Sequence, residues 1–122
     1  MTFRSLAGAA AIFALGATQA AAGQCGYEYC WGAVGIGQNG AWGYSYGQFS
    51  ENDAINVAQN GCGGNCYEIR TFYNTCGAMA VADNGAWGFG WNASAEIAES
   101  EAMSYCMDGG YNCQVRVSAC SH

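Results

Sequence analysis

The side chains that carry out acid–base or nucleophilic chemistry are scarce in this sequence. It contains no lysine, which excludes Schiff-base chemistry, and its only histidine is the last residue, His122, which we expect to be frayed. A serine or cysteine nucleophile would therefore lack a positioned base. A carboxylate pair of the glycosidase type, drawn from Glu96, Glu99 and Glu101, is the alternative to a simple helix-surface role for these residues. The sequence predicts that the protein is not an enzyme.

The cysteines indicate structural disulfide bonds rather than catalysis. There are eight: Cys25, Cys30, Cys62, Cys66, Cys76, Cys106, Cys113 and Cys120. An even number of cysteines in a short exported chain predicts a disulfide framework. Zinc is the alternative, but the spacings Cys62-x3-Cys66 and Cys106-x6-Cys113 are not those of a zinc knuckle. We therefore expect no metal and no other cofactor.

The aromatic side chains are the feature of the sequence that most directly suggests a function. Six of them occupy alternate positions in two short stretches: Trp42, Tyr44, Tyr46, Trp87, Phe89 and Trp91. Alternate residues of a strand share one face, so each trio should form a stripe, and an exposed stripe could stack on sugar rings or anchor a protein partner. Burial in the core is the usual fate of large aromatic side chains and is the competing interpretation. A binding role requires that at least one of Tyr44, Tyr46 and Trp91 be exposed, whereas Trp42 and Trp87 are better placed for packing.

The charge balance argues against two classes of partner. The formal net charge is −6, and once Arg4 is removed with the leader described next, Arg70 and Arg116 are the only cationic side chains. Nucleic acids and anionic membrane surfaces both require cations on the protein. We therefore expect neither partner, and we interpret the acidity as an aid to solubility.

Residues 1–22 are typical of a signal peptide. Arg4 precedes an apolar run from Ser5 to Gly16, and the small residues Ala20 to Ala22 suit a signal peptidase. The run is shorter than the roughly 20 residues that span a bilayer, so we expect no membrane insertion after cleavage. A buried N-terminal helix is the alternative. Cleavage would leave residues 23–122 as a single disulfide-rich domain of a secreted or periplasmic protein, expected to be a monomer.

An internal repeat organises this domain. Residues 32–44 align with residues 77–89, and both copies contain Asn-Gly-Ala-Trp-Gly followed by an aromatic residue. The two repeats extend over about 32–76 and 77–120.

Each repeat is predicted to begin with a β-hairpin. Asn39-Gly40 and Asn84-Gly85 favour two-residue type I′ turns. This register places Trp42, Tyr44 and Tyr46 opposite Gly37, Gly35 and Ala33. It places Trp87, Phe89 and Trp91 opposite Ala82, Ala80 and Ala78. The other face then carries Val34 and Ile36, or Met79 and Val81, opposite small residues that include Gly43 and Gly88. These glycines should leave a groove for a closely packed helix.

A helix and a final strand complete each repeat. Ser50 and Ser94 are candidate N-caps, and small residues recur on one helix face at Ala54, Ala58 and Cys62 and again at Ala98, Ala102 and Cys106. Strands are predicted over 67–73 and 114–119, with Arg70 and Arg116 in their middles. The fold class is therefore α+β, with two pseudo-symmetric ββαβ units sharing one antiparallel sheet.

The same symmetry favours one disulfide pattern among the 105 that eight cysteines allow. Two bridges would each join the end of one helix to the strand that follows it. A third would join the final strands of the two repeats. The pattern is Cys62–Cys66, Cys106–Cys113, Cys76–Cys120 and, by remainder, Cys25–Cys30.

These residues resemble a known family. The paired hairpins, the alanine-rich helices ending in Cys62 and Cys106, and the closing Cys120 are similar to the bacterial secreted proteins called the domain of unknown function 4189 family, from about Trp31 to Cys120. The resemblance implies an extracytoplasmic domain, sometimes attached to other secreted modules, and assigns no catalytic role.

The leading functional hypothesis is a non-catalytic extracytoplasmic binding module for a protein or a cell-wall glycan of the envelope. An inhibitor or immunity role against a secreted enzyme is a narrower form of it. One alternative is a small secreted enzyme that uses a carboxylate pair, and another is a structural envelope protein without a discrete ligand.

Overall fold

The computed structural model describes residues 23–122, and the expected signal peptide lies outside them. The elements are β1 (Trp31–Gly37), the short turn η1 (Gln38–Gly40), β2 (Trp42–Gln48), α2 (Glu51–Gly61), β3 (Cys66–Tyr73), β4 (Thr75–Val81), β5 (Trp87–Asn92), α3 (Ala95–Gly109) and β6 (Gln114–Ser121). The α+β class is confirmed. That the two halves superpose as symmetric repeats stays a prediction. Neither helix in this part of the chain is long and apolar enough to cross a membrane.

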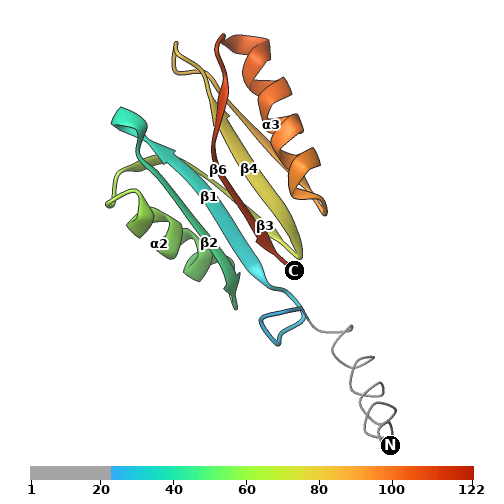
Figure 1. Ribbon diagram of the computed structural model, residues 1–122. Helices are drawn as coiled ribbons and strands as arrows, with labels where there is room; N and C mark the ends of the chain where they lie inside the picture. The colour runs from blue at the N-terminus through green and yellow to red at the C-terminus, as the bar shows by residue number, and fades with distance from the viewer. Residues whose placement is uncertain (1–22) are drawn as a thin grey trace, which may run out of the picture.

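The strands form two sheets, so the expectation of one shared sheet is wrong. The three-stranded antiparallel sheets have the orders β2-β1-β3 and β5-β4-β6. They pack face to face, with α2 and α3 on the two outer sides (Figure 1). The reason is that each hairpin is apolar on both faces. Val34, Ile36 and Phe72 of one sheet bury themselves against Met79 and Val117 of the other.

The hairpin register differs by one residue from the expected one. Both loops have three residues, not two: Gly37 N–H donates to Ala41 C=O at 2.8 Å, and Ala82 N–H donates to Ala86 C=O at 2.8 Å. In the first loop Asn39 and Gly40 have φ of 60° and 77°.

This slip exchanges the partners across each hairpin. Trp42 and Tyr44 lie opposite Ile36 and Val34, and Trp87, Phe89 and Trp91 lie opposite Val81, Met79 and Gly77. The aromatic stripes therefore share the face between the sheets with the large aliphatic residues.

The groove for a closely packed helix is confirmed, on the remaining face. A methyl group at Gly43 would overlap the carbonyl oxygen of Ala58 in α2, and one at Gly88 would overlap that of Ala102 in α3. Both predicted caps are also confirmed: the hydroxyl oxygens of Ser50 and Ser94 accept hydrogen bonds from the first turns of α2 and α3.

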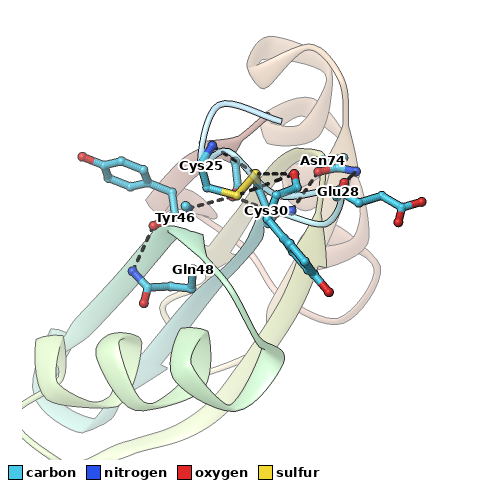
Figure 2. Close-up of a disulfide and its surroundings, with 9 residues drawn as sticks. Cys25, Glu28, Cys30, Tyr46, Gln48 and Asn74 are labelled. Atoms are coloured by element: carbon cyan, nitrogen blue, oxygen red, sulfur yellow. Dashed lines mark hydrogen bonds between the residues drawn. A yellow bond between two sulfur atoms is a disulfide. The ribbon is translucent and has the colours of Figure 1, made fainter. Parts of the chain in front are cut away.

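All four disulfides have the predicted pairing: Cys25–Cys30, Cys62–Cys66, Cys76–Cys120 and Cys106–Cys113. Cys25–Cys30 closes an N-terminal loop that Asn74, between β3 and β4, holds in place (Figure 2). The Asn74 side chain accepts from Cys30 N–H at 3.0 Å and donates to Glu28 C=O at 2.9 Å. Four bridges are typical of a protein from an oxidising compartment.

Candidate functional site

An ordered row of aromatic rings lies along β2. We call Trp42, Tyr44 and Tyr46 the β2 ladder. Neighbouring rings are nearly parallel, at 21° and 9°, with centroids 6.1 and 6.3 Å apart. Their exposed fractions are 46%, 44% and 59%. A binding role requires that at least one of Tyr44, Tyr46 and Trp91 be exposed, and this condition is met. Trp42, the better candidate for packing, is exposed as well.

The small residues that alternate with these rings pack against α2 on the opposite face of the strand. Gly43 and Ser45 face α2, where the buried Ser45 hydroxyl donates to Ala54 C=O at 2.7 Å. Helix α2 therefore packs directly on the backbone of β2, with no long side chains between them. This contact supports the strand that carries the β2 ladder.

A groove of about 480 Å³ runs between the β2 ladder and β6, where edge strands of the two sheets meet. Its lining on the β6 side includes Arg116, Ser118 and Ala119. Arg116 is the extra residue of a β-bulge, because Met79 pairs with Val117 while Ala80 pairs with Val115. A bulge re-aims a side chain, which explains how a strand residue comes to lie at this rim.

The N-terminal loop closes one end of this groove. Gln24 contributes to the lining, and its N–H donates to His122 C=O at 2.6 Å. The Ser121 hydroxyl accepts from Gly47 N–H at 2.9 Å and donates to Cys30 C=O at 2.8 Å. Figure 2 shows Tyr46 and Gln48 of β2 beside the loop that the Cys25–Cys30 bridge closes. The ladder, the loop and the end of β6 are thus tied together.

The second aromatic trio is not part of the same surface. Trp87, Phe89 and Trp91 lie on β5, an edge strand of the other sheet, and Phe89 and Trp91 line hollows other than the groove beside the β2 ladder. Trp87 and Phe89 are half-buried against the core between the sheets, whereas Trp91 is 62% exposed. A single platform of six rings does not exist.

Comparisons with known proteins support the fold and the family. The profile of the family described as "Domain of unknown function (DUF4189)" matches residues 31–120. The chain belongs to this family. The chain is also similar to the NMR structure of Rv1813c from Mycobacterium tuberculosis, with a TM-score of 0.58, 25% sequence identity and 75% of each chain covered. No curated protein matches significantly.

Two arginines of this DUF4189 domain lie beside aromatic rings, a role the sequence analysis did not assign. The Arg70 guanidinium is 5.1 Å from the centroid of the Trp87 ring, and its Nε is 2.8 Å from a Glu68 carboxylate oxygen. Arg116 and Trp42 line the same groove. The sequence offered one hint of this role: both arginines lie in the middle of predicted strands, in a domain with two predicted aromatic stripes.

His122 lies beside a disulfide of the DUF4189 domain. Its ring lies 3.6 Å from Cys76 Sγ, but Cys76 and Cys120 are joined to each other and offer no thiolate to a metal ion. Among the three helix carboxylates of the enzyme alternative, Glu96 and Glu101 line one groove and Glu99 does not.

Proposed function

We propose that this domain is a non-catalytic extracytoplasmic binding module, and that the groove between the β2 ladder and β6 holds a glycan strand of the cell envelope. The observation that supports this most strongly is the β2 ladder itself. Three exposed, nearly parallel aromatic rings follow one another on a supported strand. Exposed aromatic rows of this kind are costly to leave in water unless they bind something.

The chemistry of the groove suits sugars. Aromatic rings offer apolar surface, while the indole N–H and the phenol hydroxyls provide polar groups at the tips of the same side chains. Across the groove, the Arg116 guanidinium and the Ser118 hydroxyl supply further donors. A repeating polymer would meet a repeating row of rings. Arg116 would complement carboxylates on the polymer, in a protein that is otherwise strongly acidic.

The proposed setting is the periplasm or the medium, reached through the signal peptide, with the domain acting as a monomer. Four disulfides support an oxidising compartment. We also propose that the two halves are pseudo-symmetric repeats. Support comes from the repeated order of hairpin, helix and strand, and from the equivalent caps at Ser50 and Ser94.

Sedimentation with insoluble peptidoglycan tests the function. The oxidised domain is expected to co-sediment, and Tyr44→Ala is expected to weaken capture about fivefold or more, as for loss of one stacked ring. Tyr111→Ala is the matched control, because Tyr111 is 60% exposed and lies outside the groove. Thermal melting should be nearly unchanged for both variants.

Two results would contradict the proposal. One is equal capture by the wild type, Tyr44→Ala and Tyr111→Ala. The other is capture of a purified envelope protein, but not of peptidoglycan, in a manner that depends on Tyr44. This second result would keep the binding module and replace the glycan with a protein, in line with an inhibitor or immunity role.

A further inference from the structure

A second groove, unrelated to the β2 ladder, lies between β5 and α3. It has a volume of about 710 Å³, within the range of ligand sites, and is lined by Phe89 and Trp91 of β5 and by residues of α3. On the other side of the same strand lies a hollow of about 510 Å³, which Phe89 and Trp91 share with Trp31 and Tyr73. The edge of β5 is therefore flanked by open space on both faces of the sheet.

The outer edge of β5 has unpaired backbone groups. Within residues 23–122, β5 is the last strand of its sheet. Ala82 and Ala86 form a hydrogen-bonded pair next to the loop. Because such pairs alternate along an antiparallel ladder, the N–H and C=O groups of Trp87, Phe89 and Trp91 point away from β4. An extended segment could pair with them as an added strand.

The α3 wall of the groove is acidic and lacks its own cations. It presents two rows at i, i+4 spacing, Glu96-Ser100-Ser104 and Ile97-Glu101-Tyr105, followed by Asp108. Asp108 lies in the last turn, where the helix dipole favours a positive charge, and that turn has no basic residue. The position of Glu101 beside β5 is shown by Gly90, whose substitution by a larger residue would press on the Glu101 side chain.

Within residues 23–122, no lysine or arginine is available to neutralise these carboxylates. The two arginines lie elsewhere: Arg70 pairs with Glu68 and covers Trp87, and Arg116 lines the groove beside the β2 ladder. A counter-charge for Glu101 and Asp108 would have to come from a partner.

We propose that the edge of β5 docks an extended, basic segment of a partner protein as an added strand. Side chains of a strand alternate between the two faces of a sheet. On the α3 face they meet Glu101 and Asp108, so every second residue of the segment is lysine or arginine. On the other face they meet Phe89, Trp91 and the hollow beside them, so the intervening residues are apolar. The recognised pattern is thus an alternation of basic and apolar residues.

Titration of the ¹⁵N-labelled, oxidised domain with a Lys-Val octapeptide tests this proposal. The peptide is expected to bind with a dissociation constant at or below about 1 mM and to shift the amide signals of Phe89, Trp91 and Glu101. Affinity should fall as salt is raised. A Glu-Val octapeptide of the same length is the control and should not bind. Absence of these shifts, shifts located away from β5 and α3, or equal binding of both peptides would overturn the proposal.

Two further comparisons separate strand pairing from simple charge attraction. Peptides N-methylated at all the valines or at all the lysines lose alternate N–H donors, and at least one of the two is expected to lose binding. If both bind like the parent peptide, no strand is added.

Glu101→Gln should weaken binding about two- to fivefold, as expected for one exposed ion pair. Glu99→Gln is the matched control, because Glu99 lies on the same helix outside the groove, and it should change affinity less. Equal effects of the two substitutions would remove the groove from the proposal. Circular dichroism of each variant checks that α3 is intact.

Discussion

The two sides of the sandwich carry similar aromatic patterns in different surroundings. On the β2 side all three rings of the β2 ladder are at least 44% exposed. On the β5 side Trp87 and Phe89 are half-buried, and only Trp91 reaches well into solvent. The periodicity of the strands is the same, so it does not explain the difference.

The difference comes from the strand across the sandwich. At the position paired with Gly32, β3 carries Phe72, whereas at the position paired with Gly77, β6 carries Ala119. Phe72 is 5% exposed and belongs to the core against which Trp87 and Phe89 pack, and Arg70 covers the Trp87 ring. Ala119 is too short to cover the β2 ladder. A ring is therefore core or surface according to the size of its neighbour in the other sheet.

Phe72→Ala should have the largest effect among the substitutions that test this comparison. Removing a buried ring leaves a cavity between the sheets, so we expect the free energy of unfolding to fall by about 3–5 kcal/mol. Chemical denaturation with the disulfides intact measures it. Tyr46→Ala removes an exposed ring and serves as control. A loss below about 1 kcal/mol for Phe72→Ala would contradict the assignment of this ring to the core.

Ala119→Phe should make the β2 side resemble the β5 side. The new ring would extend into the groove beside the β2 ladder, and peptidoglycan capture should be lost. Ala119 belongs to the buried cluster between the sheets and also lines the groove, so overpacking should cost about 1–3 kcal/mol. Sedimentation and denaturation together measure both effects. Unchanged capture by a folded variant would show that the groove is not the binding surface.

Arg70→Met should have a smaller effect on stability than Phe72→Ala or Ala119→Phe. The methionine keeps an apolar stem over Trp87 and removes the charge, so the loss should be about 0.5–1 kcal/mol, the range of an exposed cation–π contact. Arg116→Met is the matched variant: it should leave stability unchanged within about 0.5 kcal/mol while weakening capture. Denaturation curves in which the Arg116 variant loses more than the Arg70 variant would reverse the roles assigned to them.

Local features of the sequence were sufficient for the secondary structure. Ser50 and Ser94 cap the helices because a hydroxyl there accepts from a backbone N–H that has no partner in the helix. Gly43 and Gly88 admit the helices because a side chain would overlap the helix backbone. The candidate site was predicted in part: the ladder residues were named, but Arg116 was not placed beside them, because a bulge in β6 cannot be recognised from residue types alone.

The sequence by itself determined the elements and the small-residue contacts between helix and hairpin, and it favoured the pairing that all eight cysteines have. Most of these depend on residues that are near in the chain, and Cys76–Cys120 was favoured because residues 32–44 and 77–89 are similar in sequence. Tertiary structure alone decided the hairpin register, the separation into two sheets and the exposure of each ring. Asn-Gly is compatible with both two- and three-residue loops, and the register that holds is the one that buries Val34 and Ile36 between the sheets. Exposure follows from residues as distant in sequence as Phe89 and Phe72, because only packing brings them together.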